Sequence, residues 1–208
     1  MGLNSSSVFY VKVIHNHMHD WKTYFEQTKD RPPRDMLVRA LPFVNELGTA
    51  LDLGAGALND SKYLLGHGFK EVTALDIEAV AQEIAAKLPR DRFRYVIESF
   101  DSFVYEPQRY DFINAQYSLP FIAPERFDDI FKRIIASLKI GGIFSGQFFG
   151  NGDEWAHKDT MTFLTKSQVQ SLLKQFEVLY FEEEKKEKPT AAGTLKRWHV
   201  FHCIFRKR

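Results

Sequence analysis

The chain has 208 residues, of which 44% are hydrophobic and 14% aromatic, and its 28 basic and 27 acidic side chains leave a formal net charge of +1. This length suits one domain with a full core, and the near-neutral charge gives no bulk attraction to nucleic acid or to a membrane surface. The single cysteine, Cys203, excludes an internal disulfide framework, and no apolar run reaches the roughly 20 residues that span a bilayer, so we expect a cytoplasmic protein without nucleic-acid or membrane partners.

Within residues 1–19, residues 1–7 are polar, residues 8–14 form a short apolar alternation, and the histidines His15, His17 and His19 alternate after it. On a strand, this alternation places three imidazoles on one side, as candidate metal ligands. A solvated lead-in explains the same pattern, and we favour it because no cysteine or carboxylate spacing accompanies the histidines. We therefore expect an N-terminal tail without a metal, and the segment lacks the pattern of a secretory signal.

Two helices are expected before the first strand. The first covers residues 21–29, where Trp21 and Tyr24 share one helical face. It ends at the break Asp30-Arg31-Pro32-Pro33, and the second helix is expected over residues 33–47, with proline in its first turn.

The middle of the chain opens with a strand, a glycine turn, a helix and a second strand. Residues 49–53 form an apolar run that enters Gly54-Ala55-Gly56, and residues 58–65 and 72–77 suit the helix and the next strand. This succession begins a doubly wound α/β fold. The glycines allow a sharp turn and a close ligand, and Asp76, 22 residues after the first glycine, can accept hydrogen bonds from both hydroxyls of a ribose.

Two side chains near the turn distinguish the cofactors that this arrangement binds. A dinucleotide site needs Gly or Ala three places after the second glycine, where this chain has the larger Asn59. Asp52, two residues before the turn, would repel a pyrophosphate but attract a cationic amino-acid group. S-adenosylmethionine (SAM) carries a sulfonium and an ammonium and no phosphate, so these residues favour SAM over NAD.

The segment Leu51-Asp52-Leu53-Gly54-Ala55-Gly56-Ala57-Leu58 resembles the first motif of the class I SAM-dependent methyltransferases. Leu58 stands in place of the third glycine of that motif, and Asp76 matches the acid that ends the family's second strand. The resemblance covers about residues 21–207 and is strongest to small bacterial stand-alone enzymes, including the tellurite-resistance type. It implies SAM as the cofactor, held near Asp52, Gly54, Ala55, Gly56, Asn59, Asp76 and Ile77.

The resemblance also assigns roles at the next two strand ends. Strands are expected over residues 93–98 and 110–115. In the family, residues after the third strand hold the adenine, which indicates Ser99 and Phe100, with Glu98 and Asp101 as alternatives for the polar contact. After the fourth strand, Asn114 and Gln116 are available to the methionine part or to the substrate, and Tyr117 either faces the acceptor or packs in the wall.

Elements before the first strand form a lid over cofactor and substrate in many class I enzymes. The resemblance therefore implies that residues 20–47 are a helical lid, in which Trp21 and Tyr24 face the acceptor. The alternative is that these two rings only pack on the sheet edge. Arg31 is the candidate partner of the SAM carboxylate.

The second half of the chain begins with an amphipathic helix over residues 124–138. A Gly-Gly turn at residues 139–142 and a strand over residues 143–149 follow. The polar loop 150–162 holds Glu154, Trp155 and His157, and a loop of this length with an embedded tryptophan is expected to cover the acceptor pocket.

The last elements are a helix that opens with a capping box of Thr165 and Gln168, and then a strand pair. Strands are expected over residues 176–184 and 196–205, joined by a charged turn at residues 185–194. This ending resembles the antiparallel seventh strand of class I methyltransferases.

We therefore expect a doubly wound α/β fold with a mostly parallel seven-stranded sheet, an antiparallel C-terminal strand and helices on both faces, over residues 20–208. The expected function is methyl transfer from SAM to a small-molecule acceptor. The alternatives are a non-catalytic SAM-binding module that acts through a partner, and an NAD-dependent oxidoreductase. Catalysis requires no base, and the candidates are Tyr117, Glu154 and His157 if the acceptor must lose a proton. Acceptor contacts are expected from Trp21, Tyr24, Gln116, Tyr117 and Trp155.

Overall fold

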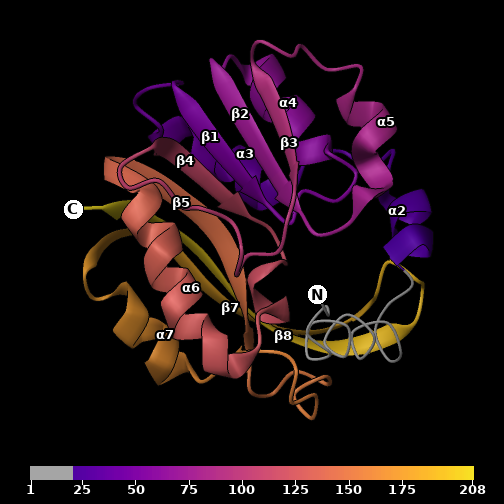
Figure 1. The fold of residues 1–208 in the computed structure, drawn as a ribbon. Coiled ribbons are helices and arrows are strands. Elements are labelled where there is room, and N and C mark those ends of the chain that lie inside the picture. Colours follow the sequence, from indigo (N-terminus) through magenta and orange to yellow (C-terminus); the bar gives the residue numbers. More distant parts are fainter. Residues whose placement is uncertain (1–20) are drawn as a thin grey trace, which may run out of the picture.

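The centre of the structure is a sheet whose main path runs β3-β2-β1-β4-β5-β8-β7 (Figure 1). The computed structural model describes residues 21–208. Its strands are β1 (Thr49–Leu53), β2 (Glu71–Asp76), β3 (Phe93–Ile97), β4 (Tyr110–Ala115), β5 (Leu138–Gly150), β6 (Phe163–Leu164), β7 (Phe176–Pro189) and β8 (Leu195–Lys207). Along the path, β1 to β5 are parallel, whereas β8 runs antiparallel to β5 and β7. The predicted fold is confirmed, and the short β6, which pairs with β5, adds an eighth strand.

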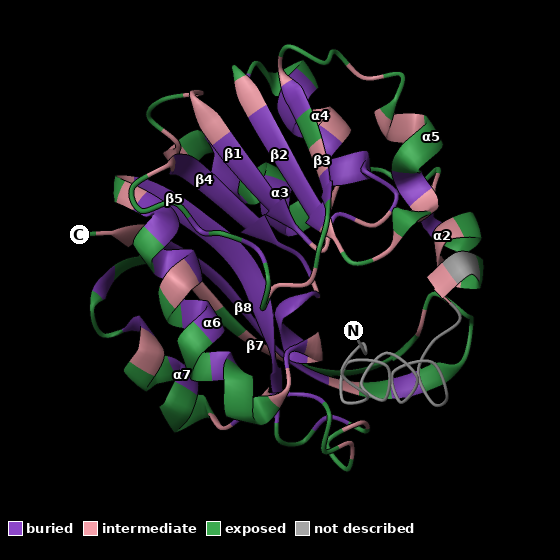
Figure 2. Cartoon of the chain, in the orientation of Figure 1, coloured by how far each residue is buried: buried purple, intermediate pink, exposed green. Residues whose placement is uncertain are grey.

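Helices cover both faces of the sheet, because side chains alternate between the faces along each strand. They are α2 (Trp21–Thr28), α3 (Asp35–Ala40), α4 (Asn59–His67), α5 (Gln82–Ala85), α6 (Pro124–Ser137) and α7 (Lys166–Leu173), with 3-10 turns η1 (Leu41–Phe43), η2 (Ala79–Ala81) and η3 (Leu119–Phe121). One hydrophobic cluster joins the sheet to α6 and α7, and a second joins it to α3, α4 and α5. The central strands are accordingly buried along most of their length (Figure 2). At α7, the predicted capping box of Thr165 and Gln168 is present.

The second predicted helix is shorter than expected. α3 ends at Ala40 and passes into η1, and the backbone is extended at Val44 (φ −81°, ψ 118°). Pro42 lies in the first turn of η1 and has no N–H with which to continue an α-helix. The prediction of a helix to residue 47 is therefore wrong at its C-terminal end.

The sequence of residues 78–88 also predicts a helix, ended by Pro89, and the structure reduces it to η2 and the four-residue α5. Within these two elements Ala81 is buried, whereas α5 has no buried residue. Short helices are stable in proteins mainly through the apolar face that they bury, and this segment buries too little apolar surface to sustain the predicted eleven or so residues.

The predicted turn at residues 139–142 is part of β5. The pairing of β5 with β4 shifts register between Tyr110 and Phe112, and Gly141 adopts a left-handed φ of +80°. The Gly-Gly pair therefore makes a bulge inside a long strand, where a turn was predicted.

The charged run near the end of the chain is mostly strand as well. β7 continues to Pro189, which pairs with Leu195, so the turn is confined to residues 190–194. Glu184 forms ion pairs with Lys186 and Lys188 along the ribbon. The prediction of a turn from residue 185 is wrong because charged side chains on an exposed ribbon face are compatible with strand pairing.

The predicted tail and its three histidines lie outside the described residues. Within residues 21–208, no helix has the length and apolar character to cross a membrane, and no three potential ligands group to hold a metal ion.

Leu58 replaces a motif glycine but adopts a glycine-like backbone. Its φ of 61° and ψ of 19° are left-handed, and its side chain is fully buried. A non-glycine residue in this conformation is strained by roughly 1–2 kcal/mol, so the buried side chain must offset the strain.

This strain predicts an unusual order of stability for two variants at position 58. Leu58→Gly and Leu58→Ala both remove the buried side chain, but only alanine keeps the strained Cβ. We expect Leu58→Gly to be more stable than Leu58→Ala by about 1 kcal/mol in urea unfolding, with both below wild type by about 2–5 kcal/mol. A more stable alanine variant would contradict the left-handed conformation.

Candidate functional site

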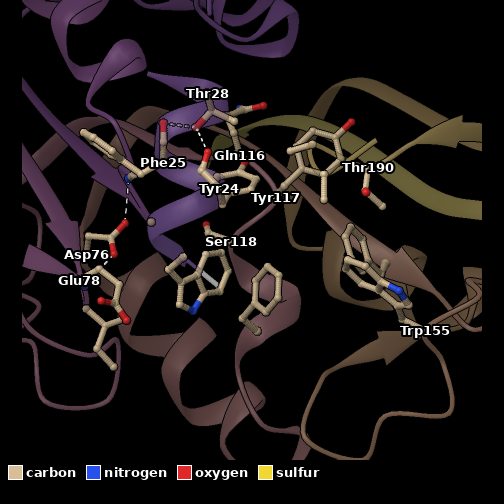
Figure 3. Close-up of a pocket in the computed structure, with 18 of the residues that line it drawn as sticks. Tyr24, Phe25, Thr28, Asp76, Glu78, Gln116, Tyr117, Ser118, Trp155 and Thr190 are labelled. Atoms are coloured by element: carbon tan, nitrogen blue, oxygen red, sulfur yellow. Dashed lines mark hydrogen bonds between the residues drawn. The ribbon is translucent and has the colours of Figure 1, made fainter. Parts of the chain in front are cut away.

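A cavity of about 1090 Å³ lies at the carboxyl ends of the parallel strands (Figure 3). Open α/β sheets bind ligands at this edge. The glycine turn and the ends of β2 and β3 line one end of the cavity, where Figure 3 shows Asp76 and Glu78. The loop after β5 and the β7–β8 hairpin line the other end, with Trp155 and Thr190. Tyr24 of α2 and Tyr117 lie between the two ends.

The cavity brings together most of the residues that the sequence indicated. These are Trp21, Tyr24, Arg31, Gly54, Gly56, Asp76, Ile77, Ser99, Phe100, Gln116, Tyr117, Glu154 and Trp155. Five predicted residues do not line it: Asp52, Ala55, Asn59, Asn114 and His157.

The glycine turn has an open side and a packed side. At Gly56 (φ +50°), a Cβ would meet no atom within 4 Å, whereas at Gly54 (φ +70°) it would lie 2.4 Å from the Cβ of Ser118. Oδ2 of Asp76 accepts a hydrogen bond from the N–H of Gly56 (2.8 Å), and its Oδ1 accepts one from the N–H of Glu78 (2.9 Å). Asp76 therefore braces the turn while it faces the cavity, and burial raises the pKa of this carboxyl.

Asp52 lies behind the cavity wall. Its side chain is 2% exposed, and its two oxygens accept hydrogen bonds from Oγ of Ser61 (2.6 Å) and Nδ2 of Asn114 (2.8 Å). Burial, together with the neighbouring carboxylate of Asp60, raises the pKa of Asp52 to about 7. Asp52 therefore does not contact the cavity directly, and it can affect a bound ligand only through the residues that it holds.

Asn59 also faces away from the cavity. Its Nδ2 donates a hydrogen bond to the carbonyl oxygen of Thr28 (2.8 Å), and the carboxylate of Asp60 accepts one from the N–H of Arg34 (2.9 Å). The start of α4 thereby fixes the end of α2 and the start of α3. Since α4 follows the glycine turn, these bonds hold α2 in place relative to the turn.

A ladder of buried amides leads from Asn114 to Tyr117. Gln116 donates from Nε2 to Oδ1 of Asn114 (2.8 Å), and Gln147 donates from Nε2 to Oε1 of Gln116 (2.8 Å). Oε1 of Gln147 then accepts the N–H of Tyr117 (2.9 Å). The ladder holds Tyr117 at a left-handed φ of 58°, which a non-glycine residue rarely adopts.

Two arginines bring buried, partnerless nitrogens to the cavity. Nε and Nη1 of Arg31, and Nε of Arg34, are buried without a hydrogen-bond partner among residues 21–208. Nη2 of Arg34 donates to the hydroxyl of Tyr24 (3.3 Å), and its guanidinium lies 4.8 Å from the centroid of the Tyr117 ring. Guanidinium N–H groups left without a partner in a cavity favour an anionic ligand group.

Lys196 lines the cavity near Trp155 and Trp198, and the sequence did not indicate it as a site residue. Its Nζ lies 2.6 Å from Oδ1 of Asp153, and the two side chains are 1% and 0% exposed. The same Nζ lies 3.5 Å from the ring centroid of Trp198 and 4.1 Å from that of Trp155. Lys196 lies two residues before Trp198 on the same strand, so the two side chains share one face. A lysine on this largely apolar face was the feature of the sequence that could have indicated the site. Burial lowers the pKa of Lys196, and the Asp153 carboxylate opposes that shift.

The three candidates for a base occupy different positions. Tyr117 lines the cavity, and burial raises the pKa of its phenol, so the hydroxyl stays protonated near neutral pH. Glu154 also lines it, but its Oε2 accepts the N–H of Arg197 (2.9 Å). His157 is exposed and outside the lining, and its Nδ1 lies 2.9 Å from the carbonyl oxygen of Glu154.

The buried Asp52 predicts a pH dependence of stability. The folded protein retains a proton on Asp52 up to about pH 7, whereas the unfolded chain releases it near pH 4. The free energy of unfolding should therefore fall as pH rises through this window, by on the order of 1 kcal/mol per pH unit from this group. Asp52→Asn removes the contribution, so urea unfolding between pH 4.5 and 7.5 should give a flatter profile than wild type. Parallel profiles would contradict the raised pKa.

The Lys196–Asp153 pair predicts a coupled stability effect. Lys196→Met leaves a buried carboxylate without its cation and should destabilise the protein by about 3–5 kcal/mol. Adding Asp153→Asn removes that charge, so the double variant should be more stable than Lys196→Met alone in chemical denaturation. Strictly additive losses would show that the two groups are not paired in solution.

Comparison with known proteins bears on this site. Residues 50–142 match a family model described as a methyltransferase domain. A search of the curated proteins found no match.

Several solved structures share the fold. TehB from Haemophilus influenzae superposes with a TM-score of 0.73 at 20% identity, over 90% of this chain and 67% of that chain. The 1,6-didemethyltoxoflavin-N1-methyltransferase from Burkholderia thailandensis, solved with 1,6-didemethyltoxoflavin and S-adenosylhomocysteine, gives 0.69 at 19% identity, over 100% and 92%. A SAM-dependent methyltransferase from Methanosarcina mazei gives 0.64 at 20%, over 85% and 99%. The resemblance inferred from the glycine turn is thereby confirmed.

Proposed function

We propose that this chain, which belongs with the SAM-dependent methyltransferases by its fold and by the sequence of residues 50–142, transfers a methyl group from SAM to a small-molecule acceptor. One observation carries the proposal. A single cavity joins the open side of the glycine turn, the Asp76 carboxylate and the partnerless Nε and Nη1 of Arg31.

The residues present fit SAM. The absent Cβ of Gly56 leaves room for a ligand against the backbone, and Asp76 has further lone pairs for ribose hydroxyls. Ser99 and Phe100 offer a hydroxyl and a ring for the adenine, and Arg31 offers two free donors for the carboxylate of the methionine part. Asp52 contributes from behind the wall, through its hydrogen bond to Asn114.

When bound, SAM supplies a methyl group already activated by the sulfonium. The chain's own residues then have to position the acceptor and exclude water. Trp21 of α2 packs edge-on against Phe121 at 5.3 Å between ring centroids, which supports the assignment of residues 20–47 as a lid. Tyr117, which keeps its proton, is suited to orient an acceptor oxygen or nitrogen by hydrogen bonding rather than to act as a base.

The alternatives receive no support. The matched family model and the superposed structures are methyltransferases, whereas neither a partner-dependent SAM-binding module nor an NAD-dependent oxidoreductase is indicated. The Burkholderia thailandensis enzyme, which acts on a small heterocycle, favours a small-molecule acceptor here as well.

Calorimetry with S-adenosylhomocysteine tests the donor site. Asp76→Ala should weaken binding by at least about tenfold, because it removes charged hydrogen bonds worth about 1.5–3 kcal/mol each. Glu71→Ala is the matched control, since Glu71 begins the same strand β2, lies outside the cavity and pairs with Arg109 at 2.5 Å. Wild-type protein that binds neither SAM nor its product, or equal affinities for the two variants, would refute the proposed site. A radiolabelled-methyl acceptor screen then tests turnover.

A further inference from the structure

One end of the cavity is formed by the loop after β5 and the β7–β8 hairpin, and we call it the acceptor end. From its side chains we infer that the acceptor is a planar aromatic molecule that carries a negative charge. This inference rests on the proposed function, because it assigns the other end of the cavity, with Arg31, to SAM. It adds the chemical class of the acceptor and the residues that select it.

Flat apolar surfaces dominate the acceptor end. Six aromatic residues from separate elements line it: Trp21, Tyr117, Phe121, Phe149, Trp155 and Trp198. Several of the rings meet edge to face, with 6.2 Å between the centroids of Tyr117 and Trp198 and 5.7 Å between those of Phe149 and Trp198. Aromatic side chains pack favourably edge to face or offset against a further ring, so this end of the cavity suits a flat aromatic ligand.

Cationic side chains of the protein already lie over the faces of two of these rings. The Arg34 guanidinium lies 4.8 Å from the centroid of Tyr117, and Nζ of Lys158 lies 4.4 Å from a ring centroid of Trp155. An aromatic cage usually recognises a cationic ligand. Here a cationic acceptor would meet like charge at these faces, so the geometry selects against it.

The positive charge at this end is not fully balanced. The ion pair with Asp153 compensates Lys196, and Glu184 is shared by Lys186 and Lys188. In contrast, neither Arg34 nor Lys158 is among the ion pairs of residues 21–208, and Glu154, which lines the same end and whose carboxylate accepts the N–H of Arg197, balances at most one of the two.

An anionic group on the acceptor would compensate the positive charge at this end of the cavity. Nε of Arg34 is buried and lacks a partner, and an anionic oxygen would accept its hydrogen bond more strongly than a neutral one. Burial also lowers the pKa of Lys158, which a bound anion would reverse. An aromatic ring at this end, with its anionic group directed at Arg34 and in the positive potential of Lys158, satisfies the apolar and the charged features together.

Four probes of similar size test this class by ligand-observed NMR titration, each with and without saturating S-adenosylhomocysteine. They are 2-naphthoate, the neutral 2-naphthylmethanol, the cationic 2-naphthylmethylammonium and the non-aromatic decahydro-2-naphthoate. We expect 2-naphthoate to bind at least about tenfold more tightly than each of the others. Equal binding of neutral and anionic naphthyl probes, or tighter binding of the cation, would overturn the inference.

Two variants locate the selectivity. Arg34→Gln should reduce the preference for 2-naphthoate over 2-naphthylmethanol to less than about threefold, and Lys158→Gln should reduce it in part. Arg39→Gln is the matched control, because the Arg39 guanidinium lies 4.4 Å from the centroid of Tyr180, which is outside the cavity, and it should keep the full preference. Thermal unfolding confirms that each variant is folded.

The outcomes separate this inference from the proposed function. If Arg34→Gln weakens S-adenosylhomocysteine and 2-naphthoate equally, Arg34 belongs to the donor site and the inference is wrong. If S-adenosylhomocysteine does not bind wild type at all, the proposed function fails, while the titrations without it still show whether the cavity selects an aromatic anion.

Discussion

The hydrogen bond between Asp52 and Asn114 is the contact on which the cavity depends. The two residues are register partners in β1 and β4, the central parallel pair, and both are buried. A buried carboxylate is tolerated only when its oxygens are satisfied, which here requires Ser61 on one side and Asn114 on the other. This requirement aligns the start of α4, and with it the glycine turn, with the end of β4. The amide ladder continues the same constraint to Tyr117.

Backbone strain gathers around this network. Leu58 and Tyr117 both have left-handed φ angles, and Gly54 is packed so closely against Ser118 that no side chain fits. Such conformations persist only where the surroundings over-determine them. Around Leu58 the surrounding force is hydrophobic burial, and at Tyr117 it is the bond from the backbone N–H to Gln147. Of these residues, Gly54 and Tyr117 line the cavity, whereas Leu58 is buried outside its lining.

Features set by local chemistry were predictable from the sequence. The bounds of β1 and β4 follow from short apolar runs, and the capping box at Thr165 follows from two side chains three residues apart. The reach of β7 and the burial of Lys196 were not predictable, since both depend on strand pairing and on Asp153, which lies 43 residues away. Asp52 shows the same limit within the site. Its position beside the turn is local information, but the direction of its carboxylate is decided by Ser61 and Asn114.

Tyr117 links the two halves of the cavity and also separates them. Its backbone ends the polar ladder that begins at Asn114, while the Arg34 guanidinium lies over its ring, which meets Phe149 and Trp198 edge-on. Beyond it, much of the acceptor end is built from the loop after β5 and the tip of the β7–β8 hairpin, which Figure 1 shows curving towards α2. Neither segment contributes a bond to the Asp52 network. Substitutions in these two segments can therefore alter which acceptor binds without moving the glycine turn. The reason is that the two ends of the cavity are connected chiefly through Tyr117, whose backbone is firmly held.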